Sequence, residues 1–272
     1  MERVRLGHGR RVFLAASASA LISACSLLTN LSDLPAGATS DGGGGDAPEV
    51  NDAALDGPFC KTHPGHALCA DFDEGSYLLG WTSPETYGNT PVLSLADGGT
   101  SPPASLLSQL GSAPDASGAA RLRFDFPATA TALHVELSLN ASSLTTPSSG
   151  ELSLLEIYEK RTSDALTAGV NIQLSSSGAE VRLTTFDDAG GRQYQSFPLP
   201  ALPTGWFRVD LDVALGVTGS LAVAFDHQTV LQRSGLTTME PGIGDSAYFV
   251  GLHGLDTAAA SVTYDDVLID TK

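Results

Sequence analysis

The chain has 272 residues, of which 42% are hydrophobic, and its formal net charge is −17 because 31 Asp and Glu outweigh 14 Lys and Arg. This length and apolar content are enough for one sizeable buried core. Such an acidic chain repels phosphate backbones and anionic lipid headgroups, which argues against nucleic-acid binding. The same acidity also serves simply to keep a protein soluble.

Residues 1–24 are predicted to be an export signal. A basic segment precedes an apolar run at residues 12–24, which is shorter than the about 20 residues that a membrane-spanning helix needs. The run ends in the letters ISAC at Cys25, which resemble a bacterial lipobox, and RRVFL from Arg10 resembles the twin-arginine export motif. The alternative is an ordinary secretory peptide in which Cys25 is incidental. We favour lipidation of Cys25, which predicts a protein anchored in the bacterial cell envelope, and Ser26 favours the outer membrane or cell surface.

Residues 25–57 are predicted to form a flexible, acidic tether. Gly, Ser, Asp, Ala and Pro dominate this segment, and it shows no apolar periodicity. We expect the tether to hold the folded domain away from the membrane and to contain no catalytic group.

Two cysteines frame the loop that opens the folded domain. Cys60, His63, His66 and Cys69 recur at every third position, and two thiolates with two imidazoles suit tetrahedral zinc. An exported protein, however, meets oxidising conditions in which two cysteines normally pair. We therefore expect a disulfide between Cys60 and Cys69 rather than a zinc site.

Alternating apolar and polar residues predict β-strands over most of the remaining chain. An opening strand is expected to end at Trp81, and a turn-rich stretch follows to Ala104. The clearest signal is residues 205–232, where a turn at residues 216–219 joins two alternating runs and predicts a β-hairpin. Ten or so short strands without a convincing helix predict an all-β fold, an antiparallel sandwich or jelly roll, over residues 58–272. Further strands are expected at residues 121–126, 133–139, 153–158, 170–174, 181–184, 248–252 and 262–269.

Several short motifs suggest a family. The first strand is marked by the letters CADFDEG from Cys69, followed by Gly-Trp at residues 80–81. The hairpin is marked by Gly-Trp at residues 205–206, which leads a strand. Near the end, YDDV from Tyr264 is similar to the last strand of many sandwich carbohydrate-binding modules. Together these features resemble the concanavalin A-like lectin/glucanase superfamily, in particular bacterial domains of the laminin-G type. The resemblance implies a jelly roll over residues 58–272 but not one activity, because this fold carries lectins, hydrolases, lyases and adhesion modules.

The strand patterns show no catalytic acid pair. Hydrolases of this superfamily carry Glu-x-Asp-x-Glu on one strand, whereas the comparable stretch ELSLLEIYE puts no second acid beside Glu156. No Gly-x-Ser-x-Gly or His-Glu-x-x-His motif occurs in the sequence. His134, His227 and His253 are isolated and are interpreted as strand or turn residues, although a lyase that pairs Tyr158 with His134 stays open. The sequence therefore predicts a protein that is not an enzyme.

Our preferred interpretation is non-catalytic carbohydrate binding at the cell envelope. Polar positions on neighbouring strands, opposite the apolar ones, offer sugars carboxylates, amides and an aromatic ring. A solvated sheet face would carry the same polar positions. A polysaccharide-cleaving enzyme and a structural adhesion protein without a sugar site are the alternatives. The predicted ligand-binding residues are Glu136, Glu156, Tyr158, Asn171, Gln173 and Arg182.

Carboxylates near both ends of the domain form a candidate calcium site. The terminal strands of such jelly rolls commonly lie side by side, and Ca²⁺ takes six to eight hard oxygen ligands. On the other hand, aspartates also recur at strand ends simply as turn formers. A structural calcium ion is therefore the one cofactor that the sequence suggests. The residues concerned are Asp71, Asp73, Glu74, Asp265 and Asp266.

Overall fold

The computed structural model describes residues 59–88, 90–160, 167–186, 191–239, 245–257 and 259–272. The predicted export signal, Cys25 and the predicted tether lie outside these residues. Within the described ranges, no helix is long and apolar enough to cross a membrane.

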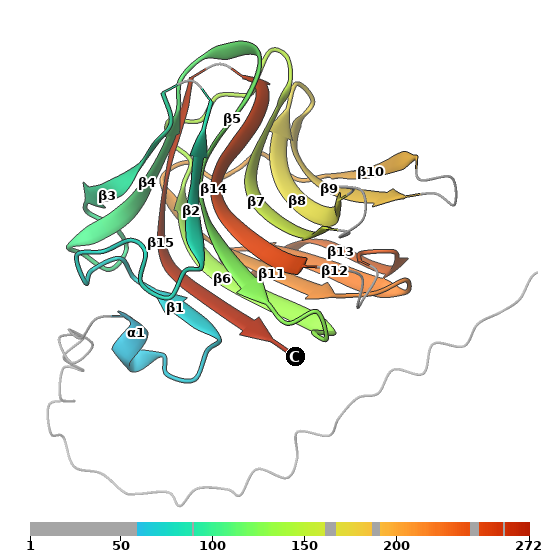
Figure 1. The fold of residues 1–272 in the computed structure, drawn as a ribbon, viewed down its shortest axis with the longest axis horizontal. Coiled ribbons are helices and arrows are strands. Elements are labelled where there is room, and N and C mark those ends of the chain that lie inside the picture. The colour runs from blue at the N-terminus through green and yellow to red at the C-terminus, as the bar shows by residue number, and fades with distance from the viewer. Residues whose placement is uncertain (1–58, 89, 161–166, 187–190, 240–244, 258) are drawn as a thin grey trace, which may run out of the picture. The chain divides into compact units, whose positions relative to one another are not determined.

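The domain consists of two β-sheets packed face to face (Figure 1). Strand pairs within the described ranges are all antiparallel, which confirms the predicted all-β antiparallel sandwich. In spatial order, the eight-stranded sheet contains β13 (Gln228–Leu236), β12 (Gly219–Phe225), β11 (Trp206–Ala214), β6 (Ala132–Asn140), β15 (Ala260–Thr271), β4 (Ala104–Leu110) and β3 (Val92–Asp97), with β1 (Leu68–Ala70) paired to β15.

The second sheet has seven strands and carries the candidate site. Its two edge strands are far apart in the sequence, and its strands come from the first as well as the second half of the domain (Figure 1). In spatial order it contains β10 (Arg192–Pro198), β9 (Gly178–Phe186), β8 (Thr167–Ser175), β7 (Glu151–Lys160), β14 (Asp245–Thr257), β5 (Ala113–Phe126) and β2 (Ser83–Tyr87).

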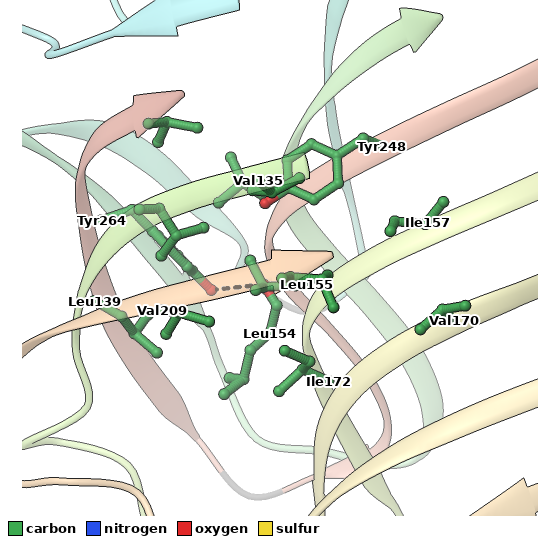
Figure 2. Close-up of a cluster of buried hydrophobic side chains, with 14 of the residues drawn as sticks. Val135, Leu139, Leu154, Leu155, Ile157, Val170, Ile172, Val209, Tyr248 and Tyr264 are labelled. Atoms are coloured by element: carbon green, nitrogen blue, oxygen red, sulfur yellow. Dashed lines mark hydrogen bonds between the residues drawn. The ribbon is translucent and has the colours of Figure 1, made fainter. Parts of the chain in front are cut away.

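The hydrophobic core fills the space between the two sheets. Period-two alternation turns every second side chain of each strand inward, and the buried positions are mainly Leu, Val and Ile. The other side chains of the seven-stranded sheet face outward and include the polar residues that line its cleft. Figure 2 shows part of this core, including Val135, Leu139 and Val209 from one sheet and Ile157, Val170 and Ile172 from the other.

The predicted hairpin is confirmed. Strands β11 and β12 pair with Val209 opposite Phe225, and β12 continues into β13 through a two-residue turn. That turn holds Asp226 and His227, whose φ angles are 47° and 63°. Two successive residues with positive φ are what a tight type I′ hairpin requires. His227 is thus a turn residue, as predicted.

The predicted opening strand is wrong in its extent. Strand β1 ends at Ala70, and the residues from there to Trp81 form turns instead of a continuous strand. The stretch predicted to be turns contains two strands, β2 and β3. Strand β2 has the sequence SPETY and lies at a sheet edge, where Pro84 is tolerated because no neighbour needs its missing N–H.

A β-bulge interrupts strand β7 and changes which of its residues face outward. Ser153 pairs with Gln173 and Leu155 with Ile172, so Leu154 is an extra residue. Both Leu154 and Leu155 are buried in the core. Strict alternation would place Leu154 on the same face as Glu156, but the bulge shifts the alternation by one residue.

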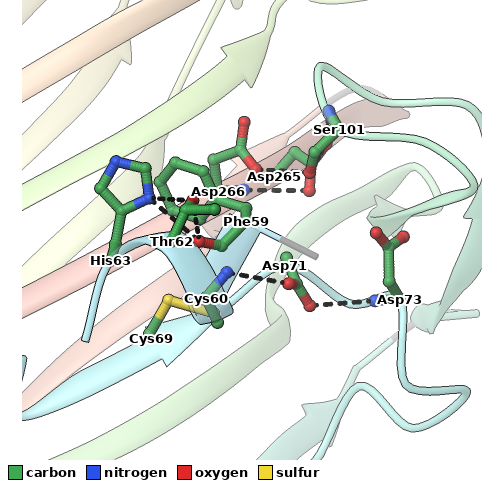
Figure 3. The surroundings of a disulfide bond; sticks show 10 residues. All are labelled: Phe59, Cys60, Thr62, His63, Cys69, Asp71, Asp73, Ser101, Asp265 and Asp266. Atoms are coloured by element: carbon green, nitrogen blue, oxygen red, sulfur yellow. Dashed lines mark hydrogen bonds between the residues drawn. A yellow bond between two sulfur atoms is a disulfide. The ribbon is translucent and has the colours of Figure 1, made fainter. Parts of the chain in front are cut away.

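The disulfide between Cys60 and Cys69 is confirmed (Figure 3). It joins helix α1 (Phe59–Thr62) to β1 with a Cα–Cα distance of 5.6 Å. His66 lies away from the sulfurs and hydrogen-bonds through Nδ1 to Asp270 at 2.9 Å. Because both sulfurs are in the bridge, the loop offers no thiolate to zinc.

Candidate functional site

A cleft of about 410 Å³ opens on the outer face of the seven-stranded sheet, and all seven strands contribute to its lining. Its polar residues alternate along each strand with core residues, so the sheet itself positions them. Near the middle of the cleft lie Arg121, Glu156, Tyr158 and His253. The strands that carry them, β5, β7 and β14, are adjacent in the sheet.

Arg121 is the buried cation of this cleft, with 4% of its surface exposed. Its Nε and Nη2 donate to one Glu85 oxygen at 3.0 and 2.8 Å, and its Nη1 donates to Glu156. The guanidinium also lies 4.0 Å from the ring centre of Phe249. A buried guanidinium needs such partners, and two carboxylates and a ring face fix its position.

Glu156 joins Arg121 to His253. Its Oε1 lies 2.8 Å from Nδ1 of His253. Burial opposes ionisation of this carboxyl, but the hydrogen bond from His253 and the charge of Arg121 outweigh burial and lower the pKa of Glu156 to about 2. An ionised carboxylate only accepts hydrogen bonds, so Nδ1 of His253 carries the proton. In the neutral ring, the nitrogen that can accept a proton is then Nε2.

Tyr158 presents its hydroxyl beside this group. The ring stacks on Phe249 with 4.7 Å between ring centres, and the hydroxyl oxygen lies 3.5 Å from Nη2 of Arg121. Burial raises the pKa of Tyr158 above its ordinary value, against the opposing effect of Arg121, so the hydroxyl is protonated at neutral pH. Gly169 is opposite Tyr158 on β8, and a Cβ there would come within 2.3 Å of the carbonyl oxygen of Ile157. Only glycine fits beside this tyrosine.

A second polar group lies toward β10. Arg182 donates to Glu180 at 2.9 Å and forms an ion pair with Glu151. Gln173 also donates to Glu180, at 2.8 Å. The side chain of Asn171, which faces the cleft between the two groups, has no hydrogen-bond partner among the residues that the structure describes. Its amide is therefore available to a ligand.

Five of the six predicted ligand-binding residues line this one cleft: Glu156, Tyr158, Asn171, Gln173 and Arg182. The sixth, Glu136, lies on β6 in the other sheet, where it pairs with Arg208 and with His134. Neither Glu136 nor His134 can join the cleft, because β6 lies between β11 and β15. A lyase that pairs Tyr158 with His134, which the sequence left open, is therefore excluded, because the two residues lie on different sheets.

Two central residues were missed or misread from the sequence. His253 does lie on a strand, β14, as interpreted, but it is not isolated: it faces the cleft and its Nδ1 bonds Glu156. Arg121 was not singled out. The sequence did show that Arg121 alternates with Leu122, which is buried. A charged residue on a solvated sheet face would show the same alternation, so the pattern does not single out Arg121.

The predicted calcium-site carboxylates bind protein donors instead. Asp265 Oδ2 accepts the N–H groups of Thr100 and Ser101 at 2.8 and 3.0 Å, and Asp266 accepts the hydroxyls of both. Figure 3 shows Ser101 beside the two carboxylates. Burial raises the pKa of Asp265 to about 7, although these N–H groups oppose the shift. Across the described chain, no three His, Cys, Asp or Glu side chains are grouped to hold a metal ion. Calcium binding stays a prediction.

The other three predicted calcium ligands lie at the start of the domain. Asp71 accepts the N–H of Cys60 at 3.1 Å, and Asp73 accepts the N–H of Ala104 at 2.9 Å. Burial and the neighbouring Asp71 raise the pKa of Glu74. Strand β1, which opens the domain, pairs with β15 at its end, so the two ends of the domain lie side by side. Burial raises the pKa of Asp73, and repulsion by Asp71 and Asp266 adds to the shift.

Solved structures of similar fold were found, whereas no protein-family model and no curated protein sequence matches the chain. The endo-β-1,4-glucuronan lyase of the fungus Trichoderma reesei has a TM-score of 0.60 and 16% identity, over 76% of this chain and 96% of that chain. The cellulose-induced protein Cip1 has a TM-score of 0.54 and 13% identity, over 75% and 97%. A family 16 glycoside hydrolase, an endoglucanase from Bacteroides ovatus, has a TM-score of 0.50 and 10% identity, over 74% and 99%.

The fold is a jelly roll of the concanavalin A-like type. The jelly-roll fold that the short motifs implied is thereby confirmed. These comparisons also overturn the prediction that the chain is not an enzyme, since a lyase and a glycoside hydrolase share its fold over 96% and 99% of their lengths. At 10–16% identity the likeness concerns the fold, so the reaction must be argued from the cleft of this concanavalin A-like domain itself.

Proposed function

We propose that this concanavalin A-like domain is a polysaccharide lyase that cleaves a uronate-containing polymer by β-elimination. The observation that carries the proposal is the hydrogen bond between Glu156 and His253, which orients an imidazole in the cleft that the Tyr158 side chain also lines. The fold shared with a glucuronan lyase supports this choice.

Hydrolysis fits the cleft poorly. A retaining glycosidase needs two carboxyl groups about 5 Å apart, one of them a proton donor. Glu151 and Glu156 are the carboxylates among the described lining residues, and they lie on one strand with four residues between them. Glu156 has a pKa of about 2 and cannot hold a proton for a leaving group, and Glu151 is paired with Arg182. Neither is arranged as an acid–nucleophile pair.

Elimination instead needs a base, an acid and stabilisation of negative charge. Nε2 of His253 would remove the proton on C5 of a uronate unit. The C5–H electron pair then forms the C4=C5 double bond, the C4–O4 bond breaks, and the Tyr158 hydroxyl gives its proton to O4. Arg121 would stabilise the phenolate that forms on Tyr158. His253 then releases the C5 proton to solvent and Tyr158 takes a proton from solvent, so both groups return to their starting states. The Asn171 amide would donate to the uronate carboxylate.

The test is an absorbance assay on purified domain with polyuronates and neutral glucans. Elimination gives a conjugated, ultraviolet-absorbing end on each new chain, and we expect this signal from a polyuronate only. His253→Gln should reduce the rate at least about 100-fold, which is the ordinary contribution of a general base. His134→Gln is the matched control, because His134 also bonds a carboxylate but lies on the other sheet. Equal rates in the two variants would refute the assignment.

We also propose that lipidation of Cys25 holds this enzyme at the bacterial cell envelope, where it would meet extracellular polysaccharide. The lipobox-like letters before Cys25 and the polar segment after it support this location. Labelled fatty acid should enter the full-length protein in cells and should be lost in Cys25→Ser. Labelling that persists in Cys25→Ser would refute the anchor.

A further inference from the structure

Two tyrosines stand out on the surface of the domain. Tyr87 is 43% exposed and Tyr194 is 57% exposed, and among described Phe, Tyr and Trp residues no others are classed as exposed. Both line the cleft. Exposed aromatic rings cost solvation free energy, and rings collected in one polar cleft indicate a ligand with flat apolar faces. Sugar rings have such faces.

The two tyrosines mark opposite ends of the cleft. Tyr87 lies on β2 and Tyr194 on β10, the two edge strands of the seven-stranded sheet. Six strand-to-strand steps of about 4.8 Å separate their backbones, or roughly 29 Å along the sheet. The ring of Tyr87 lies 6.3 Å from the ring of His253, and the guanidinium of Arg182 lies 5.6 Å from the ring of Tyr194. Each tyrosine is thus held beside one of the two polar groups described above.

The part of the cleft between Tyr158 and Tyr194 is lined by small side chains. Cross-strand pairing sets Tyr158, Gly169, Thr184 and Tyr194 in one row across β7, β8, β9 and β10. Gly169 has no side chain and Thr184 has a small one, so the row forms a trough between two aromatic rings. This trough has room for sugar units away from His253.

We propose that Tyr87 and Tyr194 are the terminal stacking platforms of one extended binding site. A polysaccharide chain would cross all seven strands, with the catalytic groups nearer the Tyr87 end, and several consecutive sugar units would be needed to reach both rings. The nature of the sugar rests on the proposed function, whereas the stacking does not. It follows that the enzyme cuts inside long chains and acts poorly on short ones.

The test measures the affinity of the cleavage-deficient variant His253→Gln for oligouronates of two to eight units and for neutral glucan oligomers of the same lengths. Adding Tyr194→Ala or Tyr87→Ala should weaken binding of the longest oligomers about threefold to tenfold, the range of one aromatic contact, and should leave the shortest unchanged. Tyr194→Phe should bind as the parent does. Leu79→Ala, which truncates a side chain 58% exposed and absent from the cleft lining, is the control.

The outcomes separate this inference from the proposed function. Length-dependent binding that needs both tyrosines, in a protein that cleaves nothing, would support the platforms and refute the lyase. Cleavage by the wild type, with tyrosine variants that bind every length like the Leu79→Ala control, would refute the platforms alone. Absence of binding to oligouronates and to neutral glucan oligomers alike would refute both, whereas binding of neutral oligomers only, through both tyrosines, would refute the lyase and keep the platforms.

Discussion

The hydroxyl of Tyr264, in the eight-stranded sheet, donates a hydrogen bond of 3.0 Å to the carbonyl oxygen of Leu154, in the seven-stranded sheet (Figure 2). Leu154 is the bulge residue of β7 and has no register partner on β8 or β14. Both residues are fully buried. The bond therefore supplies a donor to the carbonyl of a bulge residue that lies outside the regular pairing, and the bulge turns Ser153 as well as Glu156 toward the cleft.

Tyr264→Phe should lower the free energy of unfolding by about 1–3 kcal/mol, because it leaves the buried Leu154 carbonyl without a donor. Chemical denaturation measures this difference. Tyr248→Phe is the matched control, since the Tyr248 hydroxyl is equally buried but has no hydrogen-bond partner among the described residues. We expect that control to be neutral or slightly stabilising. Equal losses in the two variants would show that the bond to Leu154 contributes nothing.

Glu156→Gln should change how stability depends on pH. The pKa of Glu156 is about 2 in the folded protein, below the ordinary value of 4.5, so its contribution is present above pH 4.5. That contribution, at most roughly 3 kcal/mol, is lost as pH falls from 4.5 toward 2. Thermal unfolding between these pH values should therefore be less pH-dependent in the variant. Parallel curves for both proteins would contradict the lowered pKa.

Gly169→Ala should displace Tyr158. The new Cβ would lie 2.3 Å from the Ile157 carbonyl oxygen and 2.8 Å from Cβ of Tyr158, so the strands must separate. We expect a loss of about 1–3 kcal/mol in stability together with a lower cleavage rate. Gly118→Ala is the control, because the nearest atom to its Cβ is 3.5 Å away. If Gly169→Ala is as active and stable as this control, the glycine is not required beside Tyr158.

Tyr158→Phe should keep the fold and lose the reaction. The ring can still stack on Phe249, but the proton donor is gone. We expect kcat to fall about 100-fold or more, because general acid catalysis ordinarily contributes about 10²–10⁴ to the rate. The KM should change little, since the ring remains. A wild-type kcat in this variant would move the acid role to another group.

Period-two patterning was enough to predict the sandwich and most of the cleft face. Glu156, Asn171 and Arg182 belong to β7, β8 and β9, which are consecutive in the chain and adjacent in the sheet. Alternation along such neighbours places their polar residues together without further information. The same reasoning failed for Glu136, because strand β6 crosses to the other sheet and no local signal marks that crossing.

The proposed catalytic centre could not be assembled from the sequence. Arg121 and His253 come from β5 and β14, which are distant in the chain and are joined to β7 only by long-range pairing. The bulge at Leu154 added a one-residue shift that alternation cannot reveal. His253 therefore looked isolated, although its partner Glu156 was already a candidate.

Product analysis in ¹⁸O-labelled water tests the central claim most directly. The wild-type domain is incubated with a polyuronate, and the products are examined by mass spectrometry. Elimination adds no water, so we predict unsaturated oligomers whose new ends carry no ¹⁸O. Saturated products that carry ¹⁸O at the new reducing end would contradict the account and identify a hydrolase.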